Sequence, residues 1–501
     1  MSTEEKRRVL LIEPPFYRLY KETYSLDRYP LSLGYLAGTV RKETDWDVLA
    51  CNADFVPNSE PKRVSHLTGE GFQRYLHNLS DLSGGVWEDV RATVREFAPD
   101  VVGITSKSQN FASACSVARI VKEINPDTLV VVGGPHPSMV GADALKCEAI
   151  DVLARGEGER TLVELLDAIA SGRGLDAVPG LIVRKGGEFV ETPPRAYMDD
   201  LDSLPYPHEH APVVLKDYAK YPVDAYKNIF ATRGCPYNCF FCGSRKIWSR
   251  HVRFRSAPNV IREIQGLQKM GLKFVHFDDD TFGINKKYIA ELCDGIRTQC
   301  PGLKWSCELN VKLVDDETIA MMKAAGLYHV QIGIESGNNE MLKRIRKGIT
   351  IEEALEACRI IKSHGIELEA FFIVGFPEET EETLRDTVAA MEAIQADSIS
   401  YSIFTPYPGT ETFDFCKEHG LVGDDFNVAL FNHQSPANCF CMHIKPDRFR
   451  ELVADVEQRV DRKNERSRVK TKFSLRTLKR VQELGLRRSF RKAWRMVTGR
   501  R

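Results

Sequence analysis

The chain has 501 residues, of which 43% are hydrophobic and 28% are charged, and its formal net charge is −1. This composition is typical of a globular protein with room for two or three domains. No apolar run approaches the roughly 18 residues that a membrane span requires. Pro14 and Pro15 end the short apolar run near the N-terminus before it reaches the length of a signal-peptide core. The sequence therefore predicts a cytoplasmic protein.

The chain contains 13 cysteines, an odd number, and they are scattered over its whole length. In a long cytoplasmic chain this pattern argues against a disulfide framework and leaves thiols free to bind metal. We expect most of them to be small buried apolar residues. Cys439 and Cys441 are close in sequence, but two thiols are too few for a cluster, and we interpret them as structural.

Strand-like and helix-like segments alternate in the first part of the chain. Strands are predicted over 9–12, 46–52, 101–105, 129–132 and 149–154, and helices over 31–41, 87–97, 112–124 and 161–169. This alternation predicts a doubly wound parallel sheet that binds ligands beyond the carboxyl ends of its strands, in the loops after Ile12, Thr105 and Val132. Residues 180–194 predict a hairpin. The first domain is expected to span 1–194.

A second alternating series follows an Asp- and Pro-rich segment, which predicts an ordered linker over 195–226. Its strands are predicted over 229–232, 273–277, 304–309, 329–334, 368–374 and 398–404, and its helices over 258–269, 286–298, 316–324, 351–363 and 379–394. Six strand–helix units favour a partial TIM-like barrel over an open sheet, although periodicity fits either. This second domain is expected to span 227–425.

Three cysteines, Cys235, Cys239 and Cys242, follow the first strand of this series within eight residues. Gly234 and Pro236 keep their loop open. Thiolates are the ligands of iron–sulfur clusters, and three of them can hold three irons of a cubane, which leaves the fourth iron open to a ligand. The alternative is a zinc knuckle, but zinc sites need four protein ligands and no fourth Cys or His follows at normal spacing.

The spacing of these cysteines, with Phe241 before the last one, resembles that of the radical S-adenosylmethionine (SAM) enzymes. The resemblance continues through later strand ends and covers residues 229–410, including 405–410 at the sixth strand end. It implies a 4Fe-4S cluster that cleaves SAM to a 5′-deoxyadenosyl radical. It also implies SAM contacts at Phe241, Asp279, Asp280, Glu335, Ser336 and Gly375. The acids at 278–280 depart from the Gly-Gly-Glu of many members, and no catalytic residue is assigned.

The first domain resembles the cobalamin-binding domain that precedes the radical domain in the largest subgroup of this family. Gly133-Gly134 is retained, Ser106 and Ser108 take the place of a Ser-x-Leu motif, and the usual first-loop histidine is absent. This departure implies that the cobalt has no histidine from the protein as its lower axial ligand. His136 is a weaker candidate ligand, and a flavodoxin-like domain that only docks is the alternative. Implied cobalamin contacts are Pro15, Ser106, Ser108, Gly133, Gly134, Pro135, His136, Gly156 and Glu157.

The C-terminal region, 426–501, ends in a basic segment. Residues 461–501 contain 16 Lys or Arg and 3 Asp or Glu, and an apolar helical stripe begins at Phe473. A basic amphipathic helix with aromatic residues can lie on an anionic membrane surface. Packing on the body of the enzyme is an equal alternative, and binding to nucleic acid is the least expected.

The predicted cofactors are thus a 4Fe-4S cluster, SAM and cobalamin. The resemblance implies methylation of an unactivated carbon or a phosphinate of a small-molecule or lipid substrate. One alternative is a cyclase or rearrangement enzyme of tetrapyrrole or polycyclic lipid pathways, and another is a non-catalytic iron–sulfur or corrinoid-binding protein. The expected partners are an external electron donor of the flavodoxin or ferredoxin type and, through 461–501, the inner membrane surface.

Overall fold

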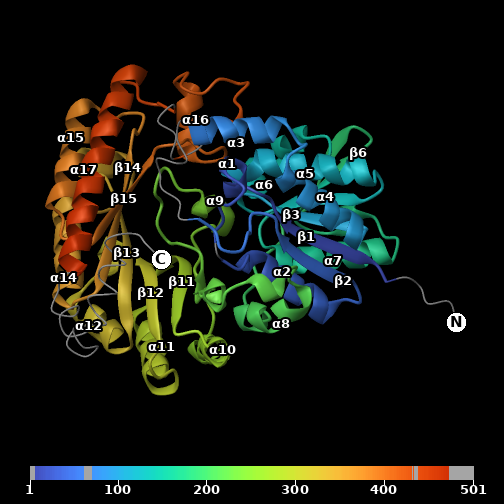
Figure 1. Ribbon diagram of the computed structural model, residues 1–501, viewed down its shortest axis with the longest axis horizontal. Helices are drawn as coiled ribbons and strands as arrows, with labels where there is room; N and C mark the ends of the chain where they lie inside the picture. The colour runs from blue at the N-terminus through green and yellow to red at the C-terminus, as the bar shows by residue number, and fades with distance from the viewer. Residues whose placement is uncertain (1–5, 27, 61–69, 432, 434–437, 473–501) are drawn as a thin grey trace, which may run out of the picture.

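The computed structural model describes residues 6–26, 28–60, 70–431, 433 and 438–472. Figure 1 shows two sheets, one formed by the blue and cyan N-terminal part of the chain and the other by the yellow and orange part. Both are predominantly parallel, so the expected α/β class is confirmed. The stripe expected from Phe473 onward lies outside the described residues.

The N-terminal sheet has the strand order β2-β1-β3-β4-β5-β6-β7. Its strands are β1 (Arg8–Glu13), β2 (Asp47–Asn52), β3 (Val101–Thr105), β4 (Leu129–Gly133), β5 (Val152–Ala154), β6 (Leu181–Lys185) and β7 (Glu188–Glu191). The first five are parallel, whereas β6 and β7 form the predicted hairpin. The chain order reverses between β1 and β3, where such sheets have their ligand crevice.

Helices cover both faces of this sheet, which explains why β1 is apolar throughout. Val9 and Leu11 pack with α2 (Leu31–Glu43) and α7 (Gly158–Ala170). Leu10 and Ile12 pack with the other face's helices, α3 (Glu70–Ser80), α4 (Gly85–Phe97) and α5 (Phe111–Ile124). Successive strand side chains point to opposite faces, so a sheet covered on both sides needs continuous apolar strands. Helix α3 was not predicted.

The expected linker, 195–226, is ordered, but it includes a helix that the sequence did not predict. This helix, α8 (Pro207–Val214), begins at a proline, which suits the first helical turn. Its buried Val214 belongs to the core cluster beneath α2, and Pro205 lies against Gly38 of α2. The segment therefore completes the covering of the first sheet.

The second sheet is a six-stranded parallel sheet in chain order. Its strands are β8 (Asn228–Ile229), β11 (Phe274–Phe282), β12 (Lys304–Leu309), β13 (Leu327–Glu335), β14 (Glu367–Val374) and β15 (Ser398–Ile403). Because β8 and β15 are opposite edges, the strands form an open partial barrel, as expected. The strand predicted over 229–232 was wrong in extent: β9 (Thr232–Arg233) pairs instead with β10 (Arg253–Phe254) in a separate antiparallel pair.

Helices pack on the outside of this sheet (Figure 1). They are α10 (Ala257–Lys269), α11 (Lys286–Gln299), α12 (Asp316–Ala324), α14 (Ile351–Ser363), α15 (Glu381–Ala393) and α17 (Pro446–Lys472). Helix α17 buries Phe449, Val456 and Val460. Lys463 donates to Met391 O at 2.7 Å, so the start of the basic segment packs on the body. Within the described ranges, no helix has both the length and the apolarity to cross a membrane.

Candidate active site

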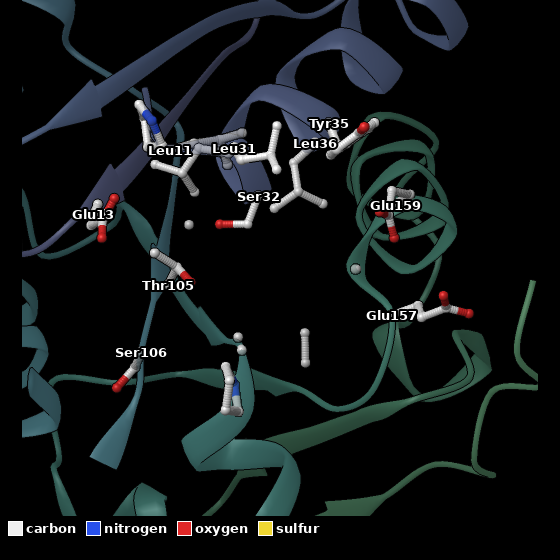
Figure 2. Close-up of a pocket in the computed structure, with 18 of the residues that line it drawn as sticks. Leu11, Glu13, Leu31, Ser32, Tyr35, Leu36, Thr105, Ser106, Glu157 and Glu159 are labelled. Atoms are coloured by element: carbon white, nitrogen blue, oxygen red, sulfur yellow. The ribbon is translucent and has the colours of Figure 1, made fainter. Parts of the chain in front are cut away.

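A cavity of about 560 Å³ lies at the carboxyl ends of the N-terminal strands. Figure 2 shows Leu11, Leu36, Thr105 and Glu157 around its open volume. Its lining comes from β1, β3, β4 and β5, from α2 and α7, and from the second domain. The crevice thus occupies the place that the strand order dictates.

The inner part of the cavity is an apolar slot between the sheet and helices α2 and α7. Leu11, Leu33, Leu36, Val131 and Leu165 line it. Gly103 of β3 also lines the slot, and a Cβ atom there would lie 2.8 Å from Leu11 Cδ2. An isolated glycine within a strand marks a close approach, and this signal was overlooked in the sequence. The slot can accept a flat apolar group.

The two predicted glycines at the end of β4 have different structural roles. Gly134 has φ +99°, and its Cβ atom would lie 2.9 Å from Ser106 O, so the backbone requires glycine there. Gly133 faces the same side of β4 as Val131, and a Cβ atom on it would meet only Ala154, at 3.7 Å. A side chain at Gly133 would therefore project into the cavity, which is the observation expected for a ligand cradle.

Six of the nine residues predicted to contact cobalamin line this cavity. They are Ser106, Gly133, Gly134, Pro135, Gly156 and Glu157. Pro15, Ser108 and His136 are not among the lining residues. His136 Nδ1 instead lies 3.0 Å from Ser108 Oγ, and its ring packs on Phe111. Burial lowers the pKa of His136 to about 4. No histidine belongs to the lining in the described part of the chain.

The second domain contributes part of the cavity lining. Its residues there include Phe230, Trp248, Asp278 and Asp280. Asp280 also accepts a hydrogen bond from Gly234 N at 3.2 Å and one from Ser244 Oγ at 3.2 Å. These two partners flank the three cysteines in sequence. A single carboxylate therefore lines the cavity and closes the cysteine loop.

The three cysteines lie on the loop between β9 and α9 (Ser244–Trp248). Cys235 and Cys239 are half-buried and Cys242 is exposed, and none forms a disulfide. Cys235 Sγ lies 3.3 Å from Thr281 Oγ1, at the end of β11. Among the described residues no group of three or more His, Cys, Asp or Glu side chains surrounds a single metal-ion position. The three thiols share one loop, and thiolates are the ligands that hold the separate irons of a cluster.

The predicted SAM residues Asp279 and Asp280 point to opposite faces of β11. The carboxylate of Asp279 is buried and accepts hydrogen bonds from Ala231 N at 2.8 Å and Thr232 Oγ1 at 3.0 Å. Burial raises its pKa to about 7. Asp279 thus fixes the segment between β8 and β9, whereas Asp280 faces the cavity. A direct contact of either residue with SAM stays a prediction.

Glu335 ends β13 in a strained conformation, and Ser336 follows it. Glu335 has φ +74°, next to a register shift between Gly333 and Glu335. Bulges re-aim side chains, and here the Glu335 carboxylate pairs with Lys347 Nζ at 2.7 Å. Burial alone would lower the pKa of Lys347, but the charge of Glu335 raises it above its ordinary value. Ser336 is fully buried and its Oγ lies 3.1 Å from Thr387 Oγ1.

Phe241 and Gly375 lie near each other through Phe376. The Phe241 and Phe376 rings are 5.8 Å apart between centroids. Gly375 has φ +91° and its N–H donates to Glu379, a fully buried carboxyl group whose other oxygen has no partner within the described structure. Burial raises the pKa of Glu379 to about 8. The turn after β14 is therefore held by a group that folding favours in its protonated form.

Two family models match the chain: the radical SAM superfamily over residues 229–391 and the B12 binding domain over residues 17–166. An uncharacterised methyltransferase of Pyrococcus horikoshii is 31% identical over 424 residues, which cover 83% of this chain and 84% of the relative. The chain belongs to the radical SAM enzymes that carry a cobalamin-binding domain. The cofactors of this radical SAM enzyme are a 4Fe-4S cluster, SAM and cobalamin.

Two further comparisons place the enzyme within its family. The anaerobic magnesium-protoporphyrin IX monomethyl ester cyclase of Rubrivivax gelatinosus is 30% identical over 410 residues, covering 79% of this chain and 71% of the relative. The methyltransferase TsrM of Kitasatospora setae, solved with cobalamin and a [4Fe-4S] cluster bound, superposes with a TM-score of 0.67 at 20% identity. That match covers 89% of this chain and 85% of TsrM and supports the two-domain fold.

The residues present fit the cofactors that the family implies. The slot behind Gly133 would take the cobalamin tail, the three cysteines would bind the cluster, and the strand ends of the second domain would bind SAM. Sequence reasoning missed Lys347, which pairs with the predicted SAM residue Glu335, and Arg233, which pairs with Glu157 and Glu159 of the first domain. The sequence offered one signal for Arg233, its position directly before Gly234-Cys235, but none for these pairings.

Proposed function

We propose that this enzyme transfers a methyl group to an unactivated carbon or a phosphinate of a small molecule. The observation that carries the proposal is Asp280, which lines the cavity and also holds both ends of the cysteine loop. A methyl donor in the cavity would then lie next to the source of the radical. The cofactors supply the radical and the methyl group, and the protein supplies position and exclusion of water.

Polar side chains on strands β12 to β15 of the second sheet favour a polar substrate. Glu369 accepts hydrogen bonds from Gln331 Nε2 at 3.3 Å and Ser400 Oγ at 2.5 Å. Glu308 lies on the neighbouring strand β12, and desolvation together with the charges of nearby acids such as Asp278 raises its pKa to about 7. Polar groups inside a pocket select ligands that can pair with them. These residues support a polar small molecule over a polycyclic lipid.

Methyl-deuterated SAM tests the proposed reaction. Anaerobically reconstituted and reduced enzyme is incubated with it and with fractionated polar metabolites, and the products are analysed by mass spectrometry. We expect 5′-deoxyadenosine together with a product that carries the deuterated methyl group. Absence of 5′-deoxyadenosine under reducing conditions would point to a non-catalytic binding protein.

Ring formation or rearrangement is the second candidate, because the Rubrivivax cyclase covers most of this chain. The same experiment separates the two reactions. A cyclase would form 5′-deoxyadenosine and a product that has lost hydrogen without gaining the label. A product of this kind from a tetrapyrrole fraction would replace methylation as the proposed function.

The proposal also includes two partners of the enzyme, an electron donor and a membrane surface. Reductive cleavage of SAM needs a one-electron donor, and we expect a flavodoxin or ferredoxin to supply it in the cytoplasm. The basic segment 461–501 would bind anionic lipid at the inner membrane surface, since each basic residue near such a surface contributes about 1 kcal/mol. Neither partner is needed for the assignment of the cofactors.

A further inference from the structure

Arg233, two residues before Cys235, is bound to the first domain by two buried carboxylates. Its Nη1 lies 2.7 Å from Glu157 Oε1 and its Nη2 lies 2.5 Å from Glu159 Oε1. The Arg233 side chain is 11% exposed, and the two glutamates are 4% and 6% exposed. Glu157 and Glu159 stand at the start of α7, so the pairs join the second domain to the wall of the cobalamin cavity.

A second arginine, Arg253, also pairs with the Glu157 carboxylate. Arg253 Nη1 lies 2.8 Å from Glu157 Oε2 and donates to Met198 O at 2.7 Å. Arg253 and Arg233 are opposite each other in the β9–β10 pair. Burial alone would raise the pKa of Glu157, but the hydrogen bond from Arg253 and the charge of Arg233 hold it below its usual value. Both oxygens of the Glu157 carboxylate thus accept hydrogen bonds from protein groups, since Met198 N also donates to Oε2 at 2.7 Å.

The other end of this linkage is the cysteine loop. Gly234 follows Arg233 directly, and its N–H donates to Asp280. Gly234 has φ +106°, and a Cβ atom there would collide with His251 O, so the loop passes close to the backbone that precedes β10. Arg233 and Cys235 are thus separated by one residue whose N–H is held by Asp280, and a displacement of Arg233 is expected to move Cys235.

A contribution to stability alone does not account for such a network of buried ion pairs. Buried ion pairs often contribute no more than well-packed apolar residues, whereas the loss of one partner leaves a buried charge unpaired. What the pairs do provide is a fixed geometry, because the planar arginine fork binds carboxylates in defined directions. The network joins the cavity wall to the first cluster ligand within a few bonds.

We propose that Arg233, Arg253 and Glu157 are positioning residues that set the distance between the iron–sulfur cluster and the cobalamin, and that Glu157 is not itself a cobalamin ligand. The inference rests on the proposed use of both cofactors in one reaction. It predicts that weakening the network leaves both cofactors bound but spreads their separation. When the residues that support a site are lost, the positions of the groups in the site become uncertain by about 1 Å.

The test uses the full-length holoenzyme with the cluster reduced and the cobalamin in its cob(II)alamin state. Pulsed EPR measures how much faster cob(II)alamin relaxes when the cluster is reduced than when it is oxidised, a quantity that falls steeply with their distance. The variants are Glu157→Gln and Arg233→Lys, which keep size and some hydrogen bonding. Glu263→Gln is the control, because its pair with Arg255 is equally buried but lies within the second domain.

We expect iron and cobalamin contents to match the unaltered enzyme in all three variants. The relaxation enhancement should fall by about twofold or more in Glu157→Gln and Arg233→Lys and stay unchanged in Glu263→Gln. Unchanged enhancement in both network variants overturns the proposal. So does selective loss of cobalamin in Glu157→Gln with retention in Arg233→Lys, because Glu157 would then be a ligand. If the unaltered enzyme binds only one of the cofactors, the proposed function itself fails.

Discussion

A Cβ atom on Gly375 would lie 2.5 Å from Cζ of Phe449, a fully buried ring of the C-terminal helix α17. Gly375 directly follows β14 and has φ +91°, at the turn where the family resemblance implies a SAM contact. The C-terminal helix is therefore packed directly behind a turn that is predicted to bind SAM, and it restricts the residues that this turn can contain.

Gly375→Ala should lower both stability and SAM affinity. A left-handed conformation costs a non-glycine residue about 1–3 kcal/mol, and the added methyl group must displace Phe449. Gly271→Ala is the matched control, with φ +99° and no atom within 4 Å of its Cβ position. Thermal unfolding and equilibrium dialysis of labelled SAM measure the two effects. Equal SAM affinities for both variants would contradict a role for this turn.

The buried carboxyl group of Glu379 should make stability depend on pH. Burial raises its pKa from 4.5 to about 8 in the folded protein, so its contribution is complete below pH 4.5 and is lost as pH rises to about 8. The slope approaches about 1.4 kcal/mol per pH unit between these limits. Glu379→Gln cannot ionise and should remove this slope.

The two proteins are compared as apoproteins by denaturant unfolding at several pH values between about 5.5 and 8.5. This range covers most of the interval in which the slope is expected. The difference in unfolding free energy should shift in favour of the Gln variant as the pH rises. If both proteins change in parallel, the Glu379 carboxyl group is not protonated in the folded state.

Gly133→Leu should prevent cobalamin binding without disturbing the fold. Its side chain would enter the cavity, where the Cβ atom meets only Ala154 at 3.7 Å. We expect hydroxocobalamin affinity to fall by about tenfold or more, equivalent to at least 1.4 kcal/mol. Gly84→Leu, whose Cβ position has no neighbour within 4 Å, serves as control. Undiminished retention of cobalamin by Gly133→Leu would place the cofactor elsewhere.

The triple variant with alanine at Cys235, Cys239 and Cys242 should bind no cluster. We expect about four irons per chain in the reconstituted enzyme and nearly none in the variant. Replacing Cys439 and Cys441 by alanine tests whether that pair takes part, and iron should then be unchanged. Iron and acid-labile sulfide analyses give the result, and a triple variant with full iron content would exclude this loop as the site.

Two truncations separate the roles of the basic segment. A chain that ends at Glu457 lacks Val460, Lys463 and Asn464, which pack on the body of the protein, and should lose about 1–3 kcal/mol of stability. A chain that ends at Lys472 keeps these contacts and should bind all three cofactors. If the segment binds membranes, only the full-length protein will sediment with anionic vesicles, and less so in high salt. Equal sedimentation of the Lys472 chain would move the binding surface to the folded body.

The sequence predicted the features that depend on local pattern. Cysteine spacing depends only on the loop that carries it, so Cys235, Cys239 and Cys242 were recognisable as a set. The alternation of strands and helices likewise predicted both sheets, because each element's periodicity reflects the faces it must bury. Gly133-Gly134 marked the end of β4, because two adjacent glycines at a strand end indicate a turn with special backbone angles or a close approach to a ligand.

The tertiary structure alone decided which way each acidic side chain points and what it pairs with. Asp279 and Asp280 are neighbours in sequence, but strand parity sends one into the β8–β9 segment and the other to the cavity. Glu157 belongs to a motif that suggested a cobalamin contact, yet its partners are arginines 76 and 96 residues away. A buried carboxylate needs a counter-charge, and no local pattern determines which distant arginine the fold will bring to it.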